Sequence, residues 1–484
     1  MPNSSNGRSR RFPAPAPRDG ADLCDLLAYV HEYSTDYARR GDIAPPADHR
    51  DIAWRFDYPL PDAGADARTV LDELITNGEP GLLHSGAPTF LGFVMGGAYP
   101  VAIATEWLTS MWDQCGALYA TSPTASVVEA TVAQWLVELF GVPATTSIGI
   151  TSGCATANLA GLAAARHAVF ATAGWDIEQD GLVGAPTPRI LVSRSCHVTV
   201  FRALRLLGLA GQVISVPTEA DGRIRLSALA ETVDATSGPL IVCGQLGNVD
   251  CGSVDPIDAL CDITHAAGGW VHLDAAFGMW AAASATRSHL VWGLERVDSW
   301  ATDAHKWLNV PYDCGIVGCA HPDAHRAAMR TSADYLTAAS GAARDPADFT
   351  PDLSRRARSL VIWATLRQLG RSGVAELVDR CCRLARRLAG ELATVEGIEI
   401  RNAVVLNQVL VSFDSVSTAE VVARIQAGGV GWASATSWRG EPALRLSVCN
   451  WQTTAADIDA CARAIIDAYH AVAQPDRNAE GLYA

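Results

Sequence analysis

Short apolar runs alternate with helical patterns between residues 126 and 320, and turn residues separate them. Such runs predict strands, and strands that alternate with helices predict right-handed βαβ crossovers and a mainly parallel sheet. Ligands of these sheets gather at the carboxyl ends of the strands. The clearest predicted strands are residues 190–193, 213–216, 240–243 and 270–274.

The pattern changes on either side of this region, which predicts four parts. They are a disordered arm (1–20), an N-terminal helical dimerisation segment (21–125), a large domain (126–370) and a small C-terminal α/β domain (371–484). Ser195 is expected to cap the helix that follows it, and a long helix is expected from about Leu353. An Ala- and Gly-rich stretch at 336–351 predicts a mobile loop.

The composition of the chain disfavours several classes of binding partner. The 484 residues carry a net charge of −15 without a basic run, so neither nucleic acid nor a membrane surface is expected. The 13 cysteines lack metal-ligand spacing, which predicts no metal site and suits the reducing cytoplasm. The arm lacks the apolar core of a signal peptide, and no apolar stretch is long enough to span a membrane.

Lys306 is the only lysine among 37 basic residues. A lysine amine can lose its proton and attack a carbonyl, whereas arginine stays protonated. The lysine follows Asp303 and His305, and it could also be an ordinary surface residue. Asp274 ends an apolar strand and, alone, is equally well a structural residue. His197 lies at a strand-to-helix turn, where a lone histidine is more often structural than catalytic.

Seven motifs give these residues a common context. They are TSP at 121–123, TSGCATANLAGLAAAR at 151–166, HVTVFRALRLLG at 197–208, HLDAAF at 272–277, DAHKW at 303–307, RDPADFTPDLSRRAR at 344–358 and LRLSVCNWQTT at 444–454. In this order, the motifs resemble the group II pyridoxal 5′-phosphate (PLP)-dependent decarboxylases, which include aromatic-L-amino-acid and glutamate decarboxylases. The resemblance covers the chain from about residue 25 to its end.

The resemblance implies an α/β, fold type I PLP enzyme, similar to aspartate aminotransferase, in which residues 126–370 bind the cofactor. Lys306 would hold PLP as a Schiff base, and Asp274 would face the pyridine nitrogen and keep it protonated. His197 would stack on one face of the ring, with Ala276 beneath the other.

The phosphate contacts implied by the resemblance come from the turn Gly153, Cys154 and Ala155, whose backbone N–H groups can bind an anion, and from His305. Two residues depart from the family pattern. Ala155 replaces a serine of many relatives, and Asp303 replaces an asparagine of the animal decarboxylases. Because a carboxylate would repel phosphate, Asp303 is expected to point elsewhere, toward an arginine.

The implied reaction is decarboxylation of an L-amino acid to the amine and CO2, through a Lys306 aldimine and a quinonoid intermediate, with Tyr335 returning the proton. An aldehyde synthase, aminotransferase or lyase on the same fold stays an alternative. A non-catalytic PLP-binding scaffold is a third reading, which Lys306, Asp274 and His197 together disfavour.

The substrate pocket is expected to include Phe90, Phe93 and Trp112, with Trp107 nearby, although each could instead belong to the core or a dimer interface. Aromatic walls suit an aromatic or apolar amino acid. The absence of arginine from 84–115 disfavours an acidic one. The resemblance also implies a homodimer with a shared active site.

Tyr335→Phe removes only a hydroxyl group, so the variant should bind PLP and substrate yet form amine slowly. The longer-lived carbanion should then react with oxygen and give some aldehyde, ammonia and peroxide. Parallel assays of amine and aldehyde check this. Equal amine rates without aldehyde would make Tyr335 a packing residue and His197 the preferred proton donor.

Overall fold

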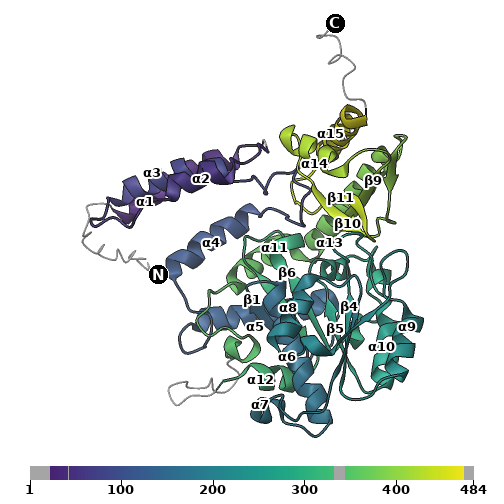
Figure 1. The fold of residues 1–484 in the computed structure, drawn as a ribbon. Coiled ribbons are helices and arrows are strands. Elements are labelled where there is room, and N and C mark those ends of the chain that lie inside the picture. The colour runs from purple at the N-terminus through teal and green to yellow at the C-terminus, as the bar shows by residue number, and fades with distance from the viewer. Residues whose placement is uncertain (1–21, 42, 332–343, 474–484) are drawn as a thin grey trace, which may run out of the picture. The chain divides into compact units, whose positions relative to one another are not determined.

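The computed structural model describes residues 22–41, 43–331 and 344–473, and the chain divides into two compact units, Met1–His84 and Ser85–Ala484 (Figure 1). Tyr335 and the first part of the predicted loop, up to residue 343, lie outside the described residues. The four domain boundaries drawn from the sequence stay predictions.

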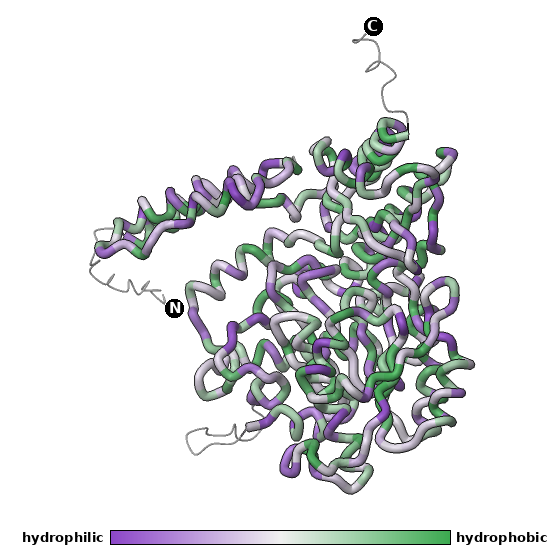
Figure 2. The backbone as a smooth tube through the Cα atoms, viewed as in Figure 1, coloured by the Kyte–Doolittle hydropathy of each residue, from purple (hydrophilic) through white to green (hydrophobic). Residues whose placement is uncertain are grey.

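The first unit contains three helices, α1 (Leu23–Ala38), α2 (His49–Phe56) and α3 (Ala67–Gly78), followed by the short 3-10 turn η1 (Glu79–Gly81). The carboxylates of Asp22, Asp48 and Asp66 cap their N-termini by accepting backbone N–H groups. Hydrophobic and hydrophilic residues alternate around these helices (Figure 2), and none of the residues described in them is buried. Their apolar side chains therefore remain available to another surface.

The second unit is built on a seven-stranded sheet with the order β1-β7-β6-β5-β4-β2-β3. The five neighbouring strands β6, β5, β4, β2 and β3 run parallel to one another, whereas β7 is antiparallel to both β1 and β6. The mainly parallel α/β fold predicted from the sequence is thereby confirmed. The strands are β1 (Ser147–Thr151), β2 (Arg189–Ser193), β3 (Val213–Val216), β4 (Leu240–Gln245), β5 (Trp270–Asp274), β6 (Ser299–Asp303) and β7 (Gly315–Cys319).

Helix α6 (Cys154–Thr172) lies against β5, β6 and β7. Gly161 permits this close approach, because a Cβ atom there would lie 2.7 Å from Cε1 of His272. The other helices of this part are α4 (Pro100–Trp112), α5 (Pro123–Phe140), α7 (Ile177–Asp180), α8 (Val198–Leu206), α9 (Leu226–Asp234), α10 (Ile257–Ala266), α11 (Ala304–Trp307) and α12 (Pro322–Met329), with 3-10 turns η2 (Ala210–Gln212), η3 (Gly278–Ala283), η4 (Ser288–Val291), η5 (Leu294–Arg296) and η6 (Pro346–Phe349).

The antiparallel strand β7 sets the geometry at the carboxyl edge of the sheet. Its first residue, Gly315, pairs with Thr151 at the end of β1 and with Asp303 at the end of β6. A Cβ atom at Gly315 would lie 2.4 Å from the carbonyl carbon of Gly153, so only glycine fits. The turn into α6 is therefore held close to the end of β6.

A second, antiparallel sheet of order β10-β11-β9-β8 forms the C-terminal part. Asn309, three residues after Lys306, ties this part to the first sheet: its Nδ2 donates to the Cys449 carbonyl (2.9 Å), and its Oδ1 accepts from the Trp451 N–H (2.8 Å). The elements are α13 (Ser359–Leu392), β8 (Ile398–Ile400), β9 (Gln408–Phe413), α14 (Thr418–Ala427), β10 (Ser434–Trp438), β11 (Glu441–Ser447) and α15 (Ala455–Ala473).

Two local predictions were wrong. The helix expected from about Leu353 begins at Ser359, because the preceding residues are held in an irregular segment by Arg355, which bonds to Thr350 and Glu129. His197, not Ser195, caps α8, since its Nδ1 accepts the Thr199 N–H (3.4 Å). The Ser195 hydroxyl instead donates to the Gly222 carbonyl (3.0 Å).

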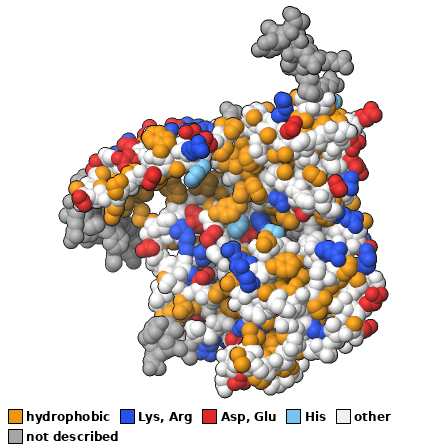
Figure 3. Space-filling view, in the orientation of Figure 1, with side chains coloured by type: hydrophobic (Ala, Val, Ile, Leu, Met, Phe, Trp, Pro, Cys, Tyr) orange, Lys and Arg blue, Asp and Glu red, His pale blue; other side chains and the backbone are white. Residues whose placement is uncertain are grey.

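Acidic and basic side chains are interspersed over the face shown in Figure 3. Among the described residues, we find no helix with the length and apolar character needed to cross a bilayer.

Glu129 and Arg355 form a buried ion pair that joins α5 to the segment before α13. Glu129→Gln keeps the shape but leaves the guanidinium buried without its countercharge, so the free energy of unfolding should fall by on the order of 3–5 kcal/mol. Asp459→Asn breaks the more exposed Arg387–Asp459 pair, which solvent screens, and should lower the free energy of unfolding far less. Urea unfolding of both variants checks this; equal losses would contradict the buried pair's role.

Candidate active site

The carboxyl edge of the first sheet brings two carboxylates and the single lysine together. Asp274 ends β5, Asp303 ends β6, and Lys306 follows within the short helix α11 (Figure 1). The Lys306 ammonium Nζ lies 3.1 Å from Asp303 Oδ2. Both carboxylates are buried, so the lysine provides charge compensation that water cannot.

The charge state of Lys306 results from opposing effects. Burial alone would lower the pKa of its ammonium, but Asp303, with smaller contributions from Cys154 and Asp274, raises the pKa above its ordinary value. An amine attacks a carbonyl only after losing its proton. Asp303 lies within hydrogen-bonding distance to accept that proton.

Asp274 is the carboxylate expected to face the pyridine nitrogen. It accepts hydrogen bonds from the Ala276 N–H (3.2 Å), the Asn158 Nδ2 (3.4 Å) and the Cys154 thiol (3.6 Å). All three donors are neutral, and no cationic side chain of the described residues lies within 4.0 Å of its oxygens. A buried carboxylate of this kind is costly unless a cation meets it, so the donor set fits a protonated pyridine ring.

His197 is held from one side by α8. Its Nδ1 lies 2.8 Å from the Thr199 hydroxyl and accepts the Thr199 backbone N–H. Burial lowers the pKa of the imidazole, and the charges of Lys306 and Arg445 lower it further against an opposing effect of Asp274. His197 is therefore a neutral ring near pH 7, which suits stacking on an aromatic cofactor.

The turn predicted to bind phosphate is already in contact with a carboxylate. The N–H of Cys154, at the start of α6, donates to Asp303 Oδ1 at 2.6 Å. The expectation that Asp303 points toward an arginine is wrong: it points to this N–H, to Lys306 and to His305 Nε2 (3.5 Å). The reason is the close approach of β6 to the turn. The phosphate roles of Gly153, Cys154 and Ala155 stay predictions.

His305 and Ala276 lie beside this cluster. The His305 Nδ1 accepts the Cys314 N–H (3.0 Å), and its ring lies 4.3 Å from that of Tyr312. Ala276 is half-buried, and its carbonyl accepts the Asp303 N–H (2.8 Å). Both residues are thus fixed near the lysine, and their cofactor roles stay predictions.

The aromatic residues predicted for the substrate pocket do not share one environment. Phe90 is only 1% exposed and stacks on Trp432. Phe93 is 51% exposed, and the Arg445 guanidinium lies 5.9 Å from its ring centroid. Trp112 is exposed at the end of α4. Of the three, Phe93 has the surroundings that best suit contact with a ligand.

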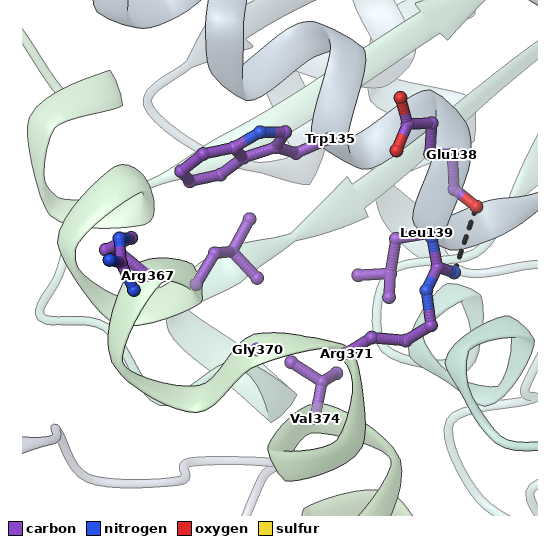
Figure 4. Close-up of a pocket in the computed structure, with 8 residues that line it drawn as sticks. Trp135, Glu138, Leu139, Arg367, Gly370, Arg371 and Val374 are labelled. Atoms are coloured by element: carbon purple, nitrogen blue, oxygen red, sulfur yellow. Dashed lines mark hydrogen bonds between the residues drawn. The ribbon is translucent and has the colours of Figure 1, made fainter.

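Two cavities differ in their relation to these residues. One of about 1010 Å³ opens beside His197 between the turns that follow β2, β3 and β4 and the β10–β11 hairpin. Another, of about 250 Å³, lies at the bend of α13 at Gly370, between Trp135, Glu138 and Arg371 (Figure 4). Of the predicted site residues, His197 lines the first cavity, and none lines the second. The first cavity is therefore the one that adjoins the candidate site.

The sequence interpretation missed several contacts. Asn158 bonds to Asp274, Thr199 bonds to His197, and Asp303 pairs with Lys306. A signal was available for two of them. Asn158 lies one helical turn after Cys154, and Asp303 lies three residues before Lys306, spacings that place side chains on one face.

The fold and this lysine–carboxylate site define a fold type I PLP-dependent enzyme. The pyridoxal-dependent decarboxylase conserved domain matches residues 50–415, which is more than half of the chain. The chain therefore belongs to the pyridoxal-dependent decarboxylase family; its cofactor is PLP, and it is a carboxy-lyase.

Relatives within the family differ in activity. The chain is 28% identical to an aromatic-L-amino-acid decarboxylase of Bacillus atrophaeus (82% of this chain, 84% of the relative). It is 29% identical to an L-2,4-diaminobutyrate decarboxylase of Rhizobium meliloti (74% and 71%) and 27% identical to a 4-hydroxyphenylacetaldehyde synthase of Rhodiola rosea (79% and 80%). The crystal structure of Oryza sativa TDC with PLP and tryptamine shares the fold, with a TM-score of 0.85 and 23% identity over 93% of this chain and 99% of that one.

Lys306→Ala should abolish turnover and the visible absorbance of lysine-bound PLP, because the chain has no other lysine. Borohydride reduction and peptide mapping of the wild-type enzyme should label Lys306. A label on another residue, or an active variant, would contradict the assignment.

Proposed function

We propose that this chain decarboxylates an L-amino acid with an aromatic or apolar side chain, giving the amine and CO2. The observation that carries the proposal is the buried Asp274 carboxylate, which receives only neutral donors yet lies near the Lys306 ammonium. When bound, PLP supplies an electron sink for the bond broken at the α-carbon.

The side chains divide the work. Lys306 would hold the cofactor, and Asp303, whose Oδ2 lies 3.1 Å from the lysine Nζ, would take or return the lysine proton. Asp274 would keep the ring nitrogen protonated: opposite charges about 4 Å apart at an effective dielectric constant near 20 attract by about 4 kcal/mol, roughly three pKa units. Neutral His197 would orient the ring by stacking. Tyr335 remains the proposed proton donor for the α-carbon.

Arg445 is the proposed partner of the substrate's α-carboxylate. It lies close enough to His197 to lower the imidazole pKa, and its guanidinium is next to the exposed Phe93 ring. Its only ion pair among the described residues is a long one, 3.9 Å to Asp250, and its buried Nε has no hydrogen-bond partner there. Such a guanidinium can donate hydrogen bonds to the substrate's α-carboxylate and so orient the bond between this carboxylate and the α-carbon.

An aldehyde synthase is the alternative with a specific relative in its favour, the Rhodiola rosea protein. Tyr335 favours amine formation, because the oxidative variant typically carries phenylalanine at the matching position. Measuring amine, aldehyde and CO2 from the wild-type enzyme separates the two activities.

A panel of L-amino acids should give the highest kcat/KM for an aromatic or apolar substrate, because Phe93 presents an exposed ring beside Arg445 and residues 84–115 lack arginine. Glutamate and 2,4-diaminobutyrate serve as charged controls, and amine and CO2 are the products measured. Fastest turnover of either control would contradict the proposed substrate class.

We also propose a homodimer. Helix α4 exposes Ile103, Leu108, Met111 and Trp112, and such an apolar face is normally covered. Light scattering should show a dimer, and Leu108→Asp should weaken it and reduce activity. Val183→Asp changes an even more exposed apolar residue outside α4 and should leave the dimer intact. A fully active wild-type monomer would contradict the proposal.

A further inference from the structure

A continuous series of buried and partly buried hydrogen bonds runs from Trp270, at the start of β5, to His197 in the candidate active site. It passes through two strands and two helices. Its links are Trp270 Nε1 to Ser299 Oγ (2.9 Å), Ser299 Oγ to His272 Nδ1 (2.8 Å), His272 Nε2 to Asn158 Oδ1 (2.9 Å), Asn158 Nδ2 to Thr199 Oγ1 (3.3 Å) and Thr199 Oγ1 to His197 Nδ1 (2.8 Å).

At the Trp270 end of the series, the donor and acceptor of each hydrogen bond are determined. An indole N–H can only donate, so Ser299 Oγ accepts from Trp270. The Ser299 hydroxyl proton can then reach His272 Nδ1 at 2.8 Å or the Gly161 carbonyl at 3.4 Å, and the shorter contact favours the histidine. His272 Nδ1 is therefore an acceptor.

The branch at Asp274 fixes the same direction independently. A carboxylate can only accept, so the Asn158 side chain turns its NH2 group toward Asp274 Oδ2 (3.4 Å). Its Oδ1 then faces His272 Nε2, which must carry the proton. Burial lowers the pKa of His272 to about 3, so the ring is neutral and holds only this one proton.

The donor and acceptor roles at Asn158 then determine which nitrogen of His197 carries the proton. The second N–H of Asn158 donates to the Thr199 hydroxyl, whose own proton is left for His197 Nδ1. The Thr199 backbone N–H donates to the same nitrogen (3.4 Å). Two donors on Nδ1 leave the proton of a neutral imidazole on Nε2.

We propose that Asn158 and Thr199 are positioning residues that hold His197 as the neutral Nε2–H tautomer, and that Asn158, through Asp274, couples this ring to the carboxylate expected to face PLP. Trp270, Ser299 and His272 fix the orientation of the Asn158 amide from behind. The close approach of α6 at Gly161 keeps His272 in place, since a Cβ atom there would displace it. His197 therefore offers a ligand a neutral ring face and a single N–H donor, at Nε2.

The first test measures the wild-type tautomer directly. The full-length enzyme, with and without PLP, is labelled with ¹⁵N-histidine, and its ring nitrogen shifts are recorded near pH 7; the His197 signals are those lost in His197→Gln. We expect an unprotonated Nδ1 and a protonated Nε2. A protonated Nδ1, in either tautomeric or imidazolium form, would overturn the proposal even if every variant failed to fold.

Variants test the named links. Thr199→Val removes the hydroxyl and should give a mixture of His197 tautomers, whereas Thr199→Ser keeps it and should retain the wild-type shifts. Asn158→Leu should also give a mixture of His197 tautomers, because the Thr199 hydroxyl loses its donor, and it should change the affinity for PLP, because Asp274 loses a donor. Wild-type shifts in Thr199→Val, or unchanged PLP affinity in Asn158→Leu, would overturn the inference. None of these measurements needs turnover, so a different substrate class would leave the inference standing.

Discussion

Asp274 and Asp303 end adjacent strands, and the Lys306 ammonium pairs with Asp303 and only influences Asp274 through space. Two buried carboxylates and one cation leave an excess of negative charge, and neutral donors such as the Cys154 thiol and the Asn158 amide offset only part of its cost. A protonated pyridine ring, in the proposed position facing Asp274, would complete the balance. The demand for this charge balance is a physical reason for the lysine and both strand ends to come together in one place.

Backbone packing makes that convergence rigid. Gly315 lets β7 start against the Gly153 backbone, and Gly161 lets α6 lie against His272. Any side chain at either glycine would move the turn or helix that carries Cys154 and Asn158. Asn309 fixes the chain just after Lys306 to the C-terminal part. The reactive groups are thus positioned by the sheet and its closest helix.

The sequence predicted what depends on local pattern. Apolar runs located β2 to β5 to within two residues at each end, and the single lysine with its neighbouring motif indicated the site. It could not predict contacts set by the tertiary fold. The Cys154–Asp303 hydrogen bond joins residues 149 positions apart, and Phe90 is buried by Trp432 from the C-terminal part. His197 replaced Ser195 as the helix cap because Gly222 takes the serine hydroxyl.

The residue proposed to contact the substrate side chain, Phe93, lies on a different kind of structure. Phe93 and Val94 have φ angles of 57° and 110°, values that non-glycine residues rarely adopt, and the Val94 N–H closes a tight turn to the Gly92 carbonyl (2.9 Å). This turn, rather than a strand or helix, presents Phe93 beside Arg445. A short loop can change sequence without disturbing the charge balance at Lys306. Such a separation would allow the substrate to differ while the reactive groups stay the same. Relatives of this chain, at 27–29% identity, carry the names of decarboxylases for different amino acids and of an aldehyde synthase.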